Sequence, residues 1–216
     1  MKSGHHLTFL AETAKGYSNL CNLISYSHIT SSRHRPELDP NLIANHTDGI
    51  TLLTGCRNGL VSTLLDEKEY EKATTTIKEY IDWFGASNVF VELQQNLVYG
   101  DTSRNNNLVT LAKKVKIGVV ATNNVHYHVP QRHRLQDALV AIRNNKSLEE
   151  THRERRPNKQ FYLKSATEMS YLFKDCPEAI RNTLVISEKC NFDLTRQLGY
   201  QFPEYPVPNG HTSQSY

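Results

Sequence analysis

The chain has 216 residues, of which 38% are hydrophobic, and its formal net charge at pH 7 is +3. This length is enough to bury a core, and the small net charge permits contact with nucleic acid without requiring it. No apolar run approaches the roughly 20 residues of a membrane-spanning helix, and the four cysteines include no Cys-x-x-Cys pair. The composition predicts a soluble protein of the reducing cytoplasm, without a zinc ribbon or a disulfide framework.

Short apolar segments alternate with helical patterns along the chain. Strands are predicted at residues 5–11, 49–56, 89–94 and 117–127. Helices are predicted at 16–25, from 39–40 onward, from 59–61 onward, at 70–83, around 108–115, at 133–145, from 165 onward and at 177–190. Alternation of this kind favours a parallel α/β fold, because each strand is followed by a helix that can cover the sheet.

Residue spacing also predicts how some helices begin and which face they bury. Asp39 before Pro40 is a helix start, and Ser165 with Glu168 has the form of a capping box. In the helix at 16–25 the predicted sheet-covering face is Tyr17, Leu20, Cys21 and Ile24. In the helix at 133–145 the apolar residues at helical period are Leu135, Ala138, Leu139 and Ile142.

Residues with metal-binding side chains stand at the predicted strand ends: His6 (or His5), Cys56, Glu92, Asn124 and His126. In parallel α/β folds chemistry gathers at the carboxyl ends of the strands. Imidazole, thiolate and carboxylate bind zinc and its first-row neighbours, and such metals activate water in phosphoesterases. His126-x-His128 on an extended segment would place both rings on one side. These residues therefore predict a metal-dependent phosphoesterase site.

Each of these residues also has an ordinary structural explanation. Two nearby loop histidines are more often solvated than metal-bound, free cysteine is commonly a small buried hydrophobe, and Glu92 can be a paired charge. The charged connector at 149–159 can contact phosphates together with His128 and His133, but a run of mixed charge is usually a solvated loop. The chain has no Walker A sequence, no Gly-x-Ser-x-Gly elbow and no glycine fingerprint.

Several blocks resemble one known family, in the order in which that family has them. They are residues 6–11, 16–20, 53–56, 91–94, 120–127, 161–165 and 190–194. They are similar to the polymerase and histidinol phosphatase (PHP) domain at the amino end of bacterial C-family DNA polymerases, the polymerase III alpha subunits. Blocks 96–102, 133–142 and 199–208 are more similar to the error-prone, damage-tolerant DnaE-type paralogue than to the replicative alpha subunit.

The resemblance implies a distorted, TIM-like (β/α)7 barrel with a trinuclear metal site used by some members for 3′–5′ exonuclease or related phosphoesterase work. By motif, His6 would be a metal ligand and Cys56 would occupy a ligand position that lines the site. Asn124 and His126 would stand where the family commonly has Asp-x-His. Asn124 departs from that pattern, because a neutral amide is a poorer ligand than a carboxylate and cannot act as a general base.

The family's first histidine and acidic motifs have no counterpart before Met1. The resemblance therefore implies an incomplete barrel: a partial PHP domain at 1–194, and a linker at 195–216 toward an absent polymerase region. A site with about half its ligands is expected to bind a divalent ion (Zn, Mn or Mg) weakly.

The leading hypothesis is a fragment of an error-prone DNA polymerase III alpha-like subunit. It would act in DNA replication and translesion repair synthesis within the full-length DNA-directed DNA polymerase, a nucleotidyltransferase, and would be inactive alone. Its partners would be DNA, the missing amino-terminal segment, the polymerase core and other repair or replication proteins, without a membrane. One alternative is a residual phosphoesterase or 3′–5′ exonuclease with His126 and Glu92 as candidate catalytic residues. Another is a non-catalytic docking module for polymerase or repair partners.

Overall fold

The computed structural model describes residues 4–32, 36–199, 206–212 and 215. The predicted linker at 195–216 and the block at 199–208 lie partly outside the described residues, as does Met1. The elements are β1 (Thr8–Ala11), α1 (Ala14–Thr30), α2 (Pro40–Ala44), β2 (Ile50–Leu53), α3 (Leu60–Asp66), α4 (Tyr70–Phe84), η1 (Ala86–Asn88), β3 (Val89–Gln94), α5 (Asp101–Val115), β4 (Gly118–Thr122), η2 (Pro130–Arg132), α6 (His133–Asn144), α7 (Ala166–Leu172), α8 (Pro177–Lys189) and α9 (Leu194–Gln197).

The four described strands form one sheet in the order β1-β2-β3-β4. Strands β2, β3 and β4 are parallel, but β1 is antiparallel to β2, with Thr8 opposite Leu53 and Ala11 opposite Ile50. The prediction of a purely parallel sheet is therefore wrong for β1. The reason lies in the connection: α1 and α2 lead out from the end of β1 and return to the same edge, where the Glu12 amide donates to the Gly49 carbonyl (2.8 Å). The described fold is mixed α/β, and the closed barrel stays a prediction.

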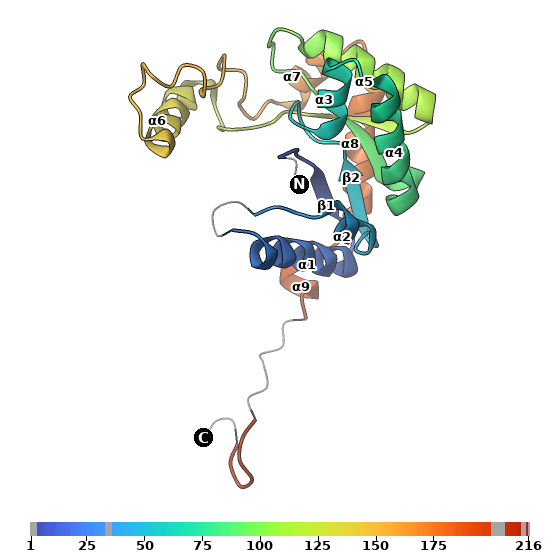
Figure 1. The fold of residues 1–216 in the computed structure, drawn as a ribbon, viewed down its shortest axis with the longest axis vertical. Coiled ribbons are helices and arrows are strands. Elements are labelled where there is room, and N and C mark those ends of the chain that lie inside the picture. Colours follow the sequence, from blue (N-terminus) through green and yellow to red (C-terminus); the bar gives the residue numbers. More distant parts are fainter. Residues whose placement is uncertain (1–3, 33–35, 200–205, 213–214, 216) are drawn as a thin grey trace.

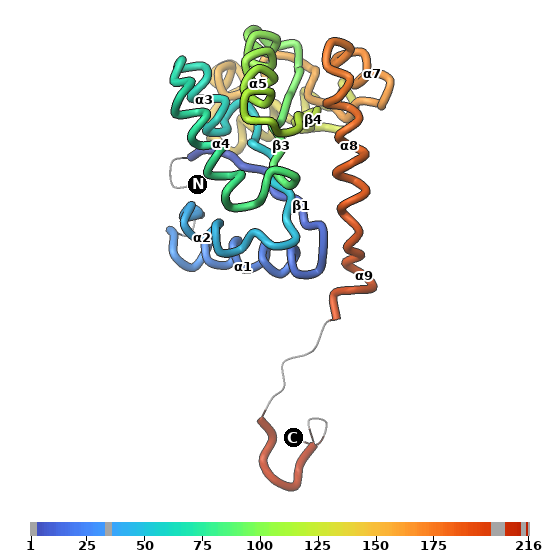
Figure 2. Tube along the Cα trace, turned by 90° about the vertical axis from the view of Figure 1, so that its right-hand side faces the viewer, coloured from blue at the N-terminus to red at the C-terminus, as the bar shows by residue number. Residues whose placement is uncertain are grey.

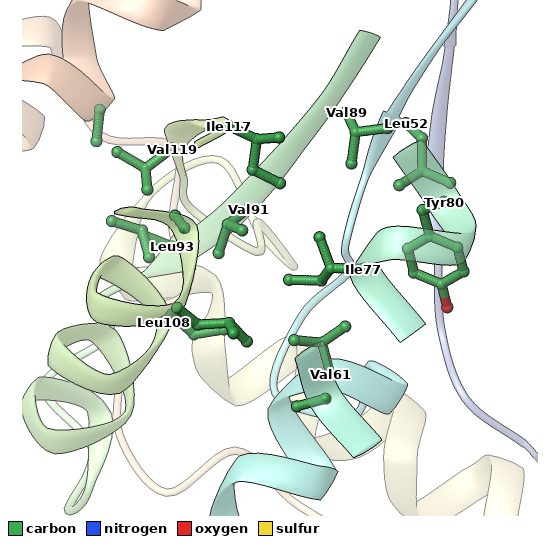
Figure 3. Close-up of a cluster of buried hydrophobic side chains, with 14 of the residues drawn as sticks. Leu52, Val61, Ile77, Tyr80, Val89, Val91, Leu93, Leu108, Ile117 and Val119 are labelled. Atoms are coloured by element: carbon green, nitrogen blue, oxygen red, sulfur yellow. The ribbon is translucent and has the colours of Figure 1, made fainter. Parts of the chain in front are cut away.

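Helices cover both faces of the sheet (Figure 1). On one face α3, α4 and α5 pack their apolar side chains against the strands, and Figure 3 shows Val61, Ile77 and Leu108 converging on Val91 and Leu93. On the other face α8 packs against a second cluster, formed by Leu53, Phe90, Val120 and Ile186. Figure 2 shows α8 on the opposite side of β3 and β4 from α4. A strand covered on both faces is apolar throughout, which explains the unbroken hydrophobic runs of the sequence.

The helix starts predicted from the sequence are confirmed. The Asp39 side chain accepts from the Asn41 amide (3.0 Å) at the start of α2. The capping box at α7 is present in both directions, between Ser165 and Glu168. Helix α4 ends at Gly85, where the backbone φ is 79°. These signals are local, which is why the sequence alone can show them.

The predicted buried face of α1 is confirmed only in part. Leu20 packs against the core, but Cys21 and Ile24 are exposed, and the buried residues of the helix are Gly16, Asn19 and Leu23. Gly16 lies directly against Gly49, where a Cβ on Gly16 would stand 1.8 Å from the Gly49 carbonyl oxygen. The Asn19 amide donates to the Asp48 carbonyl (2.9 Å). A close backbone approach and one hydrogen bond orient α1, and apolar spacing does not reveal either.

Helix α6 forms as predicted, but its apolar face does not cover the sheet. Leu135, Leu139 and Ile142 are 51%, 52% and 75% exposed, and Ala141 is the buried residue of this helix. Figure 1 shows α6 standing apart from the sheet, in the excursion between β4 and α7. Among the described residues, no helix has the length and hydrophobicity needed to cross a bilayer.

Candidate functional site

The antiparallel pairing of β1 creates the candidate site. His6 precedes β1, so it lies at the edge of the sheet where β2, β3 and β4 end. A parallel β1 would have placed His6 at the opposite edge. His6 therefore lies with the other predicted strand-end residues as expected, although β1 runs opposite to the predicted direction.

These strand ends border an open cleft of about 680 Å³. Its lining residues are His5, His6, Leu7, Thr8, Leu10, Leu53, Cys56, Glu92, Gln94, Thr122 and Asn124. Four of the predicted site residues, His6, Cys56, Glu92 and Asn124, are thus brought to one cleft, whereas His126 and His128 are not among the residues that line it.

His6 and Cys56 lie side by side in the cleft. The Cys56 Sγ lies 3.4 Å from the His6 Nδ1, and the His6 amide donates to the Asn58 carbonyl (3.1 Å). Gly55 adopts φ +88°, and the His6 carbonyl lies so close that a Cβ at Gly55 would be 2.2 Å from its oxygen. The backbone around Gly55 therefore fixes the imidazole beside the thiol.

Glu92 forms the floor of the cleft and is only 5% exposed. Its Oε2 accepts from the Thr8 hydroxyl (3.2 Å), and its Oε1 accepts from the Gln94 amide (2.8 Å) and the Thr122 hydroxyl (2.5 Å). The three donors are neutral and come from β1, β3 and β4, so the carboxylate links three strands. Glu92 is thus held by hydrogen bonds and, among the described residues, forms no ion pair.

Asn124 and His126 follow β4 but face different surroundings. Asn124 lines the cleft with a left-handed backbone (φ 46°), a conformation that asparagine adopts more readily than most residues. The His126 ring packs edge-on against Phe161 (6.0 Å between centroids), and its amide donates to the Phe161 carbonyl (2.8 Å). His128 is exposed. The structure therefore does not place His126 and His128 in the same environment.

The His126 imidazole is held in a partly apolar, positively charged environment. Its Nε2 is buried and has no hydrogen-bond partner among the described residues. Burial, and then the nearby Arg156 guanidinium, lower the pKa of His126 below its usual value. The guanidinium carbon of Arg156 lies 5.2 Å from the centroid of the Phe161 ring, the same ring against which His126 packs. The neutral imidazole is favoured here.

A buried polar network that the sequence analysis missed supports the loops behind the cleft. Asp101 accepts from the Asn96 and Val98 amides (3.0 and 3.1 Å) and from the Arg104 guanidinium (3.2 Å). Arg104 also bonds Asp66 (3.0 Å). Asp101 and Arg104 are 5% and 9% exposed. The sequence did carry a signal for this ion pair, because Asp101 stands in the first turn of α5 and Arg104 follows three residues later.

The same network ties the β4 loop to the segment before α7. The Asn96 side chain donates to the Asn123 carbonyl (3.1 Å), and the Asn123 side chain donates to the Tyr162 carbonyl. Lys164, 9% exposed, donates to the Asn123 Oδ1 (3.1 Å) and to the Gln160 carbonyl. Burial lowers the pKa of Lys164. The backbone that carries Asn124 is therefore fixed from several directions.

The described residues do not fit a multinuclear metal site. No group of three or more His, Cys, Asp or Glu side chains among them is arranged to hold an ion. His6 and Cys56 are adjacent, but the Glu92 oxygens are occupied by three donors and the His126 ring packs on Phe161. Asn124 offers only a neutral amide. The metal assignment of His6, Cys56, Asn124 and His126 stays a prediction.

Comparison with known proteins identifies the class to which this fold and cleft belong. Residues 1–96 match the family model of the PHP domain. Over essentially its whole length the chain is homologous to DNA polymerase III alpha subunits and error-prone DNA polymerases. The resemblance seen in the sequence is thereby confirmed.

Three relatives illustrate the match. The chain is 35% identical to an error-prone DNA polymerase of Nocardia farcinica over 99% of its own length and 19% of that protein. It is 30% identical to an error-prone DNA polymerase of Symbiobacterium thermophilum, with coverages of 100% and 21%. It is 32% identical to a DNA polymerase III subunit alpha of Treponema pallidum, with coverages of 98% and 18%. The chain spans about a fifth of the length of the curated relatives it matches.

Proposed function

We propose that this chain is the PHP part of an error-prone DNA polymerase III alpha-like enzyme. It acts in DNA replication and translesion repair synthesis within the full-length DNA-directed DNA polymerase. The observation that carries this proposal is the similarity to polymerases along the entire chain, 99% and 100% of it for two error-prone relatives. The four-stranded sheet, with β2, β3 and β4 parallel and helices on both faces, is then one part of a distorted (β/α)7 barrel.

We further propose that the cleft does not hydrolyse phosphoesters without further ligands. PHP domains are generally metal-dependent, and metal affinity depends on the number and preorganisation of ligands. In the cleft the His6 imidazole lies beside the Cys56 thiol, and the Glu92 carboxylate is already held by Thr8, Gln94 and Thr122. The contribution of this part of the enzyme is then to binding and architecture, and the chain belongs to the cytoplasmic replication and repair machinery.

A segment exchange tests the main proposal. The aligned segment of the Nocardia farcinica error-prone polymerase is replaced with this chain, and primer extension is measured on an undamaged template and on a template with an abasic site. The expected result is extension on both templates. A second chimera carrying Ile77→Asp, which places a charge at a fully buried position, provides the baseline of a disrupted segment. A folded chimera that extends no better than this baseline contradicts the proposal.

A residual metal-dependent phosphoesterase or 3′–5′ exonuclease is the second candidate, and the adjacency of His6 and Cys56 in an open cleft favours it. The measurement is release of the 3′ nucleotide from labelled DNA by the purified chain with Mn²⁺. Under the main proposal no metal-dependent release occurs. Release that is lost with chelator and with His6→Ala, but kept in the variant of the exposed His128→Ala, would establish the second candidate instead.

A further inference from the structure

A second cavity lies at the start of α6, away from the cleft. It has a volume of about 300 Å³ and is lined by Pro130, Gln131, His133, Arg134 and Lys159. Three of these five side chains are basic, and none is acidic. They come from η2 and the first turn of α6 on one side and from the connector before α7 on the other, so the fold brings together cations that are distant in sequence.

The segment around this cavity carries more net positive charge than the chain as a whole. Residues 130–160 contain eight Lys and Arg against four Asp and Glu, whereas the net charge of the whole chain is +3. Two of these carboxylates form ion pairs within the segment, Asp137 with Arg155 (3.3 Å) and Glu154 with Lys146 (2.7 Å). Neither Arg134 nor Lys159 forms an ion pair with any residue in the described part of the chain. The cavity therefore presents uncompensated positive charge.

The backbone on both sides of the cavity is held in place. The His133 Nδ1 donates to the Pro130 carbonyl (3.0 Å), which orients the ring at the start of α6. On the other side, Asn158 donates to the Asn96 carbonyl (2.9 Å) and accepts from the Gln160 amide (2.9 Å). Lys159 thus stands between two anchored residues. A ligand would find the two backbone segments already positioned, which lowers the entropy cost of binding.

We propose that this cavity binds a phosphate group of a DNA strand. Arg134 supplies a planar guanidinium that can donate two hydrogen bonds to one phosphate, Lys159 supplies a compact ammonium, and His133 and Gln131 add further polar contacts. The choice of DNA as the source of the phosphate rests on the proposed function. A free phosphate ion has the same chemistry, and the experiment separates the two sources.

The test is binding of a fluorescein-labelled single-stranded oligonucleotide to the full chain, followed by anisotropy at several salt concentrations. The double variant Arg134→Gln/Lys159→Gln is expected to bind at least about tenfold more weakly, the loss expected for a charged hydrogen bond. The slope of log K against log salt is expected to become shallower by about 0.7 for one lost phosphate contact.

The matched control is Lys78→Gln/Lys113→Gln, which removes the same charge from exposed positions on α4 and α5. It is expected to change neither the affinity nor the slope beyond what the loss of net charge causes. If the Arg134/Lys159 variant, shown to be folded by circular dichroism, matches this control in both quantities, the proposal is overturned.

Competition with inorganic phosphate distinguishes the two sources. The proposal predicts that millimolar phosphate at constant ionic strength leaves the oligonucleotide bound, because neighbouring nucleotides add contacts. Displacement of the oligonucleotide by phosphate alone in wild type would overturn the assignment to a DNA backbone. Because this assay measures binding and not synthesis, its failure is distinguishable from failure of the polymerase chimera.

Discussion

Replacing Gly55 with alanine tests how closely the segment with His6 packs against the loop with Cys56. Gly55 has φ +88°, which an L side chain rarely adopts, and its new Cβ would lie 2.2 Å from the His6 carbonyl oxygen. The backbone conformation costs about 1–3 kcal/mol. The clash with a main-chain atom costs about 1–3 kcal/mol more, because His6 and β1 must shift. The expected loss in the free energy of unfolding is thus roughly 2–6 kcal/mol.

The matched control is Gly85→Ala. Gly85 has a similar φ of +79°, but no heavy atom lies within 4 Å of an added Cβ. This variant should lose only the backbone cost, about 1–3 kcal/mol. The assay is urea denaturation with linear extrapolation. If Gly55→Ala is no more destabilising than Gly85→Ala, the close approach of His6 to the β2–α3 loop is refuted.

Two further predictions concern the polar groups behind the site. Asp101→Asn should lower the free energy of unfolding by about 1–3 kcal/mol in a denaturant titration, because the charged acceptor of the Asn96 and Val98 amides and of Arg104 is lost while the bond from Arg104 to Asp66 remains; an unchanged free energy of unfolding would contradict this. Hydrogen bonds from Tyr162 and Ser165 lower the pKa of Glu168 to about 2, so its contribution to stability is present above the unfolded-state pKa of about 4.3 and is lost as the pH falls toward 2. The melting temperatures of wild type and Glu168→Gln should therefore differ at pH 7 and converge in that acid range, and a pH-independent difference would contradict the assignment.

Local sequence patterns predicted the strands and helices of the core. The β-branched run that ends at Thr122 forms β4, and the helix predicted at 70–83 forms α4, which buries Ala73, Ile77 and Tyr80. The capping box at Ser165 starts α7. These features depend on the periodicity of side chains and on hydrogen bonds within one turn, so the sequence carries them directly.

Features that depend on distant contacts were not predictable in this way. The direction of β1 depends on where the chain returns after α2, and the face of α1 depends on the contact between Gly16 and Gly49. Binary patterning also could not show that Leu139 and Ile142 on α6 remain exposed. These features depend on how segments that are distant in the sequence pack, or fail to pack, against one another.

The candidate site shows the same division. The sequence placed His6, Cys56 and Glu92 at the ends of predicted strands, and in the structure these three residues line one cleft. The pattern could not show that Glu92 is engaged by three neutral donors or that the His126 ring packs on Phe161. Residue types indicate which chemistry is available, whereas hydrogen bonding decides which side chains remain free to carry it out.

Metal titration of the purified chain by isothermal calorimetry, with Zn²⁺ and Mn²⁺, tests whether the cleft is an incomplete metal site. Weak binding that is lost in the Cys56→Ser variant is expected, because the Cys56 Sγ lies 3.4 Å from the His6 Nδ1 in this cleft and no group of three or more metal-binding side chains is arranged to hold an ion among the described residues. Tight binding of a full trinuclear complement by the chain alone would contradict it.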